Sequence, residues 1–109
     1  MKMYEDYFLE RQPNGEFFHD EDGFYGVVMN GVECFIAEFH VAKEKRRSKI
    51  GTHMFNAICD VARSRGCKRV TANVSVNAKN STESLSACIA VGMKVIPGSA
   101  NVICLEKEI

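Results

Sequence analysis

Two titratable side chains that can exchange protons, Glu38 and His40, stand two residues apart in the segment CFIAEFHV. Because side chains alternate between the faces of a β-strand, we expect Glu38 and His40 to share one face with Cys34 and Ile36. A carboxylate or an imidazole in this setting is a candidate general base for an attacking nucleophile. For either residue alone, the competing interpretation is a polar side chain on a partly solvated strand.

A second candidate site follows directly, where the basic run of residues 43–49 leads into Gly51. A strand ending at Val41 and a helix beginning near Ser48 would point the free N–H groups of the helix at this run, and such an end binds anions. Glycine in the first helical turn lets a phosphate approach the backbone. The pattern therefore predicts a phosphate site, although neither the P-loop nor the dinucleotide-binding glycine motif is present. The alternatives are a solvated charge run and a nucleic-acid surface, but no aromatic residue interleaves the charges to stack bases.

The elements that must position these residues begin with a strand-like segment over residues 1–41. It contains turn sequences at 13–15 and 30–31, and Asn-Gly between β-rich runs is the strongest short signal of a hairpin. We expect an antiparallel meander there, with no helix and with an acidic loop at 19–22. That loop holds one imidazole and three carboxylates, but consecutive loop residues rarely converge on one ion, so we expect a solvated loop and no metal site.

From Ser48 onward the apolar residues recur at the three-to-four spacing of a helical face. This spacing predicts a helix from Ser48, as its N-cap, to about Arg65, closed by Gly66 in a left-handed conformation. Residues 68–77 then alternate between apolar and polar side chains, which is typical of a half-buried strand.

The C-terminal third should add a second helix and two short strands. The helix begins at Asn80, where Glu83 three residues later makes an approximate capping box, and it ends at Gly92. The remaining residues resemble two strands around the turn 97–100. The order of elements predicts a mixed α+β fold.

Length and composition limit the classes of function. With 109 residues, 46% of them hydrophobic and 26% charged, the chain fits one domain over residues 1–109. A formal net charge of zero argues against wholesale nucleic-acid binding. The five cysteines are odd in number and form no CxxC pair, so we expect reduced thiols. No signal peptide or apolar run of membrane-spanning length is present, which favours a cytoplasmic protein without membrane contact.

The basic loop resembles the cofactor motif of the GCN5-related N-acetyltransferases (GNAT), which reads V-x-x-x-x-[RQ]-x-x-G-x-[GA]. Residues 41–51, VAKEKRRSKIG, match it in register, and the order of elements over about residues 24–107 is also similar. The resemblance implies a mixed, mainly antiparallel GNAT-like sheet and acetyl-CoA as co-substrate, with no metal. It implies a pyrophosphate on the loop amides and the pantetheine arm on the backbone of Val41. The cofactor-binding residues would be Val41, Arg46, Arg47, Ser48, Lys49, Ile50, Gly51 and Thr52.

Three departures from the family pattern are visible. Lys49 stands where the first glycine of the motif usually lies. Cys88 falls at the position of the family's tyrosine general acid, and Gly92-Met93 replaces the Gly-Phe pair that follows it. The two helices that normally cover the acceptor have no counterpart in the sequence, so the acceptor side should be open.

The resemblance implies an N-acetyltransferase that passes the acetyl group to an amine by direct attack. Glu38 or His40 would accept the proton, and the Val41 amide would polarise the thioester carbonyl. Cys88 is a third candidate catalytic residue, although its apolar helical neighbours favour a core cysteine. The alternatives are a catalytically degenerate GNAT-fold module that binds CoA or a protein, and a nucleic-acid binder that uses the basic loop.

The expected partner is an amine acceptor, and an open cleft would suit a protein lysine or N-terminus. Its positive flank would meet the acidic residues Asp20, Glu21 and Asp22. Exposed strand edges in the N-terminal meander would also permit a homodimer.

Overall fold

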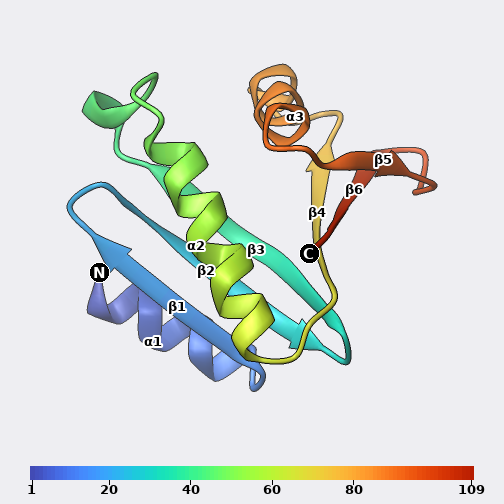
Figure 1. Ribbon diagram of the computed structural model, residues 1–109. Coiled ribbons are helices and arrows are strands. Elements are labelled where there is room, and N and C mark those ends of the chain that lie inside the picture. The colour runs from blue at the N-terminus through green and yellow to red at the C-terminus, as the bar shows by residue number, and fades with distance from the viewer.

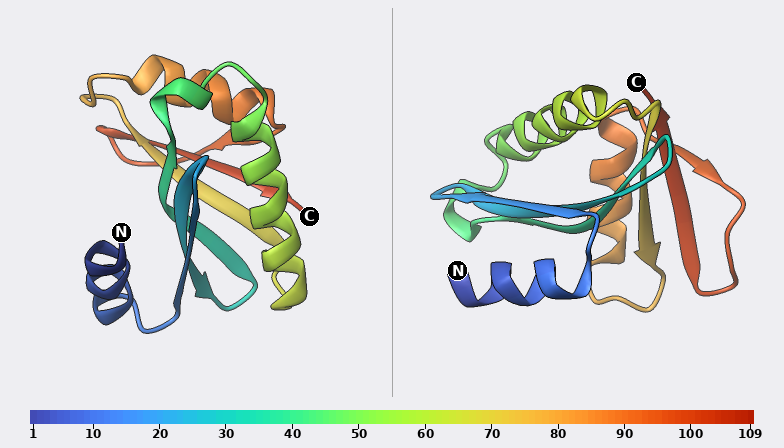
Figure 2. Two further views of the ribbon diagram at one scale, coloured as in Figure 1. Left: turned by 90° about the vertical axis from the view of Figure 1, so that its left-hand side faces the viewer. Right: turned by 90° about the horizontal axis from the view of Figure 1, so that it is seen from below.

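The computed structural model describes residues 1–109 as a six-stranded sheet with α1 and α2 on opposite faces (Figures 1 and 2). In chain order the elements are α1 (Lys2–Arg11), β1 (Gly15–Asp20), β2 (Gly23–Asn30), β3 (Glu33–Val41), the 3-10 helix η1 (Lys43–Lys45), α2 (Ile50–Ser64), β4 (Arg69–Ser75), α3 (Ser81–Ala90), β5 (Lys94–Ile96) and β6 (Val102–Glu108). The strand order is β1-β2-β3-β4-β6-β5, and only the neighbours β3 and β4 are parallel. The predicted mixed, mainly antiparallel α+β fold is confirmed.

The expectation of an N-terminal strand without a helix is wrong, because residues 2–11 form α1. Tyr4, Tyr7, Phe8 and Arg11 recur at the i, i+3, i+4, i+7 spacing of one helical face, which the β propensity of the aromatic residues obscures. Phe8 is the one residue of α1 that is buried, and its ring packs 5.6 Å from that of Phe17.

The hydrophobic core lies between α2 and the other face of the sheet. Ile58 is fully buried and its neighbours on α2 are nearly so, as expected from the helical spacing. The buried residues of α2 are Phe55, Ile58, Cys59 and Ala62. The strand residues of this core are Tyr25, Val27, Cys34, Val70, Ala72, Val74 and Leu105. Burial raises the pKa of the Cys34 thiol to about 12, so this cysteine behaves as a core residue.

The predicted turns and most element boundaries are confirmed, but both predicted side-chain caps are wrong. β2 and β3 form the Asn-Gly hairpin, and Gly66 takes a left-handed φ of 81° after α2. The N-cap of α2 is Lys49, and the Ser48 hydroxyl instead donates to the Lys45 carbonyl in the preceding loop. Asn80 is the N-cap of α3, but its side chain makes no capping hydrogen bond.

β3 and β4 part after a short parallel pairing. Their register runs from Glu33 opposite Arg69 to Ile36 opposite Ala72 and extends no further. Figure 1 shows the two strands diverging toward the ends that lead into α2 and α3. The β3 backbone from Ala37 to Val41 therefore has β2 on one side and no strand on the other.

No helix has the length and apolar composition that a membrane crossing would need.

Candidate active site

The loop at the end of the β3–β4 opening presents a row of free backbone donors. The N–H groups from Arg46 to Thr52 donate to no backbone or side-chain acceptor, and the first bond of α2 runs from His53 N–H to Lys49 O over 3.0 Å. Arg47 and Lys49 have left-handed φ values of 65° and 67°, a conformation that turns successive N–H groups toward a common point. Such a row at a helix N-terminus is suited to an anion.

The left-handed backbone at Lys49 explains why the family motif places a glycine there. A residue with a Cβ pays a steric cost in this conformation, and glycine does not. Gly51 is not crowded, because an added Cβ would make only an ordinary contact with Val41 Cγ2 at 3.7 Å. Lys49 therefore adopts a backbone conformation that glycine takes without strain, and the absence of a side chain at Gly51 leaves room beside the loop amides.

Several side chains of the basic loop are already engaged within the protein. Arg46 Nε donates to Val41 O over 3.1 Å, and Lys45 Nζ lies 3.3 Å from Asp22 Oδ1. The ion pair joins the basic loop to the turn between β1 and β2, and it leaves fewer free cations for a nucleic-acid backbone. Lys43, Arg47 and Lys49 form no ion pair.

The acidic turn lines a different cavity from the one at Glu38, because Asp20 and Asp22 border a cavity of about 390 Å³ that also reaches His53 of α2. Asp20 Oδ1 accepts from the N–H groups of Asp22, over 2.8 Å, and Gly23, over 3.3 Å, so it stabilises the turn. None of Asp20, Glu21 and Asp22 lines the cavity at Glu38.

A β-bulge decides which face Glu38 occupies. Val27 pairs with Ile36 and Gly26 pairs with Glu38, so Ala37 is an extra residue in β3. The expected common face of Cys34, Ile36, Glu38 and His40 is therefore wrong. Cys34 and Ile36 pack toward the α2 core, whereas Glu38 and His40 face α1.

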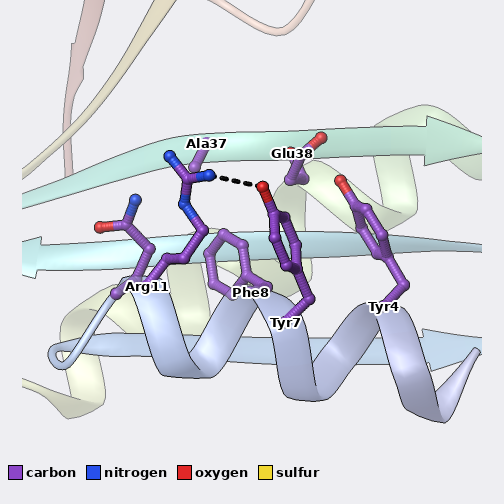
Figure 3. Close-up of a pocket in the computed structure, with 7 residues that line it drawn as sticks. Tyr4, Tyr7, Phe8, Arg11, Ala37 and Glu38 are labelled. Atoms are coloured by element: carbon purple, nitrogen blue, oxygen red, sulfur yellow. Dashed lines mark hydrogen bonds between the residues drawn. The ribbon is translucent and has the colours of Figure 1, made fainter.

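Glu38 lines a cavity of about 310 Å³ between α1 and β3 (Figure 3). The other lining residues are Tyr4, Tyr7, Phe8, Arg11, Gln12 and Ala37. The Tyr4 hydroxyl lies beside the Glu38 carboxylate, and hydrogen bonding to this carboxylate, together with burial, raises the pKa of Tyr4 to about 12. Tyr4 therefore remains a neutral phenol well above neutral pH.

His40 and Cys88 lie apart from this cavity. The exposed His40 ring stacks on Phe24, with ring centroids 5.2 Å apart, and continues an aromatic row over the face covered by α1. Cys88 lies on α3 and packs against the core, where burial raises the pKa of its thiol.

Tyr4, Tyr7 and Arg11, which line the cavity with Glu38, are not among the residues that the sequence predicts for the site. The helical spacing of these residues was the available signal, and it was overlooked because residues 1–11 were interpreted as a strand. With Ala37 in the chain, Glu38 faces α1 only because the bulge absorbs this extra residue, and no sequence pattern marks the bulge.

Comparison with solved structures finds the same fold in acetyltransferases. PaiA N-acetyltransferase from Thermoplasma acidophilum, in complex with coenzyme A, superposes with a TM-score of 0.79 at 16% identity, over 99% of this chain and 69% of that one. A GNAT family acetyltransferase from Elizabethkingia anophelis with acetyl-CoA bound gives 0.75 at 15% identity, over 100% and 84%. The anti-CRISPR protein AcrVA5 gives 0.68 at 14% identity, over 84% and 97%.

Sequence comparison with curated proteins gives no significant match. The model of the acetyltransferase (GNAT) family, in contrast, matches residues 1–85, which include α1, the cavity at Glu38 and the loop before α2. Because this match covers well over half of the chain, the protein belongs to the acetyltransferase (GNAT) family.

Proposed function

We propose that this protein transfers the acetyl group of acetyl-CoA directly to an amine, without a metal ion. The row of unpaired N–H groups from Arg46 to Thr52, at the end of the β3–β4 opening, is the observation that carries this proposal. These amides would bind the pyrophosphate, with Arg47 and Lys49 as free counter-charges.

The opening between β3 and β4 would hold the pantetheine arm. Backbone groups of β3 from Ala37 to Val41 have no strand partner on this side and, apart from the Val41 carbonyl that accepts from Arg46 Nε, are available to the amides of the arm. A ligand seated there would bring its thioester to the edge of β3, close to Glu38 on the α1 face. An N–H group of this edge would stabilise the oxyanion that forms on the thioester carbonyl.

Glu38 is our first candidate for the general base. The amine nitrogen attacks the thioester carbon, the carbon–sulfur bond breaks, and Glu38 accepts the proton that leaves the nitrogen. The departing thiolate takes a proton from water, because Cys88 packs against the core and burial raises the pKa of its thiol. His40 is the alternative base, but it does not line the Glu38 cavity.

The acceptor would be an amine, including one carried by a protein, such as a lysine or an N-terminus. Tyr4 and Tyr7, which are 37% and 51% exposed, stand at the cavity and leave it accessible from solvent. An accessible cavity of this size admits the end of a long side chain.

The test is thermal unfolding with and without acetyl-CoA or CoA. A ligand at about a hundred times its dissociation constant adds about 2.7 kcal/mol to stability. At roughly 4–8 °C per kcal/mol for a chain of this size, Tm should rise by on the order of 10 °C. Gly51→Glu should reduce the shift because it places a carboxylate at the pyrophosphate, whereas Gly51→Gln is the uncharged control. No shift at millimolar ligand would contradict the proposed cofactor site.

A second candidate function is a CoA-binding module that has lost transfer. It is favoured by the core position of Cys88, where the family has its tyrosine acid. A melting shift with acetyl-CoA, combined with no acetylation of any amine in a panel of proteins, peptides and polyamines, would support this alternative.

A further inference from the structure

The cavity at Glu38 has opposite charges at its two ends. Figure 3 shows the Glu38 carboxylate reaching from β3 beside Tyr4, and the Arg11 side chain rising from the last turn of α1 beyond Tyr7. The Arg11 guanidinium lies 5.2 Å from the centroid of the Tyr7 ring and donates to the Tyr7 hydroxyl. It pairs with no carboxylate, so most of its donors are free.

The helix sets the separation of the two charges. Tyr4, which bonds Glu38, and Arg11 are seven residues apart, which corresponds to about 10 Å along the axis of an α-helix. Arg11 reaches back along the helix to the Tyr7 hydroxyl, four residues earlier, so its guanidinium lies on the Glu38 side of its own Cα position. Tyr7, Phe8 and Ala37 supply apolar surface between the two ends.

This arrangement selects among amines by their second functional group. Glu38 attracts the ammonium form of an acceptor, which releases one proton to water before the neutral amine attacks and a second to Glu38 afterwards. The guanidinium of Arg11 matches a carboxylate or phosphate through two parallel hydrogen bonds and repels a second ammonium. A short aliphatic stem suits the apolar surface between them.

We propose that the preferred acceptor carries an anionic group, of the carboxylate type, a few methylenes from the amine that is acetylated. This inference rests on the proposed acetyl transfer and names the class of its acceptor. The same chemistry occurs in a free ω-amino acid and in a lysine with an acidic neighbour in a peptide.

The test compares three acceptors with the same five-carbon chain: 5-aminopentanoate, pentylamine and 1,5-diaminopentane. With saturating acetyl-CoA, kcat/KM should be about 10- to 100-fold higher for the carboxylate than for either of the others, as charge-assisted hydrogen bonds predict. Chains from 4-aminobutanoate to 6-aminohexanoate then locate the best length. Peptides with Lys-Asp or Lys-Asn distinguish a peptide-borne acid from a free amino acid.

Arg11→Glu should invert the order and favour the diamine. Arg63→Glu is the matched control, because Arg63 lies on the exposed surface of α2 in an i, i+3 ion pair with Asp60 and outside the cavity. Circular dichroism and Tm establish that both variants are folded. A preference that survives Arg11→Glu, or a wild-type preference for pentylamine or the diamine, would overturn the inference.

Calorimetric binding of 5-aminopentanoate separates this inference from the proposed function. If no amine is acetylated but wild type binds this acid and Arg11→Glu abolishes binding, acetyl transfer fails and the charge selection stands. If amines are acetylated without any advantage for the carboxylate, the charge selection fails alone. If 5-aminopentanoate neither binds nor reacts, the inference is wrong.

Discussion

Helices α1 and α2 cover opposite faces of the same strands, but they bury very different amounts of side chain. α2 buries four residues in the main core, whereas α1 buries only Phe8. The face under α1 instead holds a cavity, the carboxylates of Glu5 and Glu38, and a row of aromatic rings. The α2 face therefore carries most of the stability, and the α1 face is free to carry chemistry and selectivity.

The largest expected effect is on turnover, from a change on the α1 face. Glu38→Gln should lower kcat by about 10²- to 10⁴-fold, the usual result of losing a general base. Tm should change little, because the side-chain volume is kept. Glu10→Gln, on the exposed surface of α1, is the control. If the rate changes by only a few fold between pH 6 and 9, the base assignment fails, and His40→Gln tests the alternative.

The second prediction concerns stability on the α2 face. Ile58 has no exposed surface, so Ile58→Ala should lower the free energy of unfolding by about 2–5 kcal/mol. Ile89 on α3 is 53% exposed, and Ile89→Ala should change it by less than about 0.5 kcal/mol. Urea unfolding of both variants measures the difference. Equal losses would mean that the core does not lie where the burial indicates.

A smaller effect is expected on β4, on the sheet face opposite α2. Thr71 is 8% exposed and its Oγ1 has no hydrogen-bond partner. Thr71→Val keeps the shape and removes the unpaired hydroxyl, so it should stabilise the protein by about 1 kcal/mol. The control Thr82→Val, on the exposed surface of α3, should not stabilise the protein. Destabilisation by Thr71→Val would show that the hydroxyl is hydrogen-bonded in solution.

The smallest effect is spectroscopic. Tyr4 should ionise with a pKa of about 12, above its ordinary value of 10, because it donates to Glu38. Since the folded protein favours the neutral phenol, this stabilisation is complete below pH 10 and is lost between pH 10 and 12. Ultraviolet titration should show a late tyrosine step that Tyr4→Phe removes and Glu38→Gln moves to lower pH. An unchanged step in Tyr4→Phe would disprove the contact.

Sequence patterns predict the α2 side of this molecule better than the α1 side. Three local patterns predict elements that the structure contains. They are the helical spacing of apolar residues in α2, the alternation of apolar and polar residues in β4, and the Asn-Gly turn between β2 and β3. α1 was missed because its aromatic residues also favour strands, and because its one buried contact, Phe8, depends on tertiary packing.

The candidate site shows the same division. The basic loop and Glu38 are predicted from residue types and spacing, since a helix start and a titratable residue on a strand are local features. Tyr4 and Arg11 are not, because their approach to Glu38 requires α1, the bulge and the parting of β3 from β4. The packing of α1, the bulge and the separation of the two strands depend on contacts between distant parts of the chain, so no short segment predicts them.

The bulge at Ala37 also bears on how the length of β3 can vary. Ala37 is the extra residue between the Ile36–Val27 and Glu38–Gly26 pairs. A chain without Ala37 would keep both pairs, and the later side chains of β3, including Glu38, would point to the same faces of the sheet as before. A one-residue deletion that shifts the register of these pairs would instead turn Glu38 away from α1. A gap at residue 37 in an alignment of related sequences would therefore leave the carboxylate in place, and this strand can lose a residue there without losing its site.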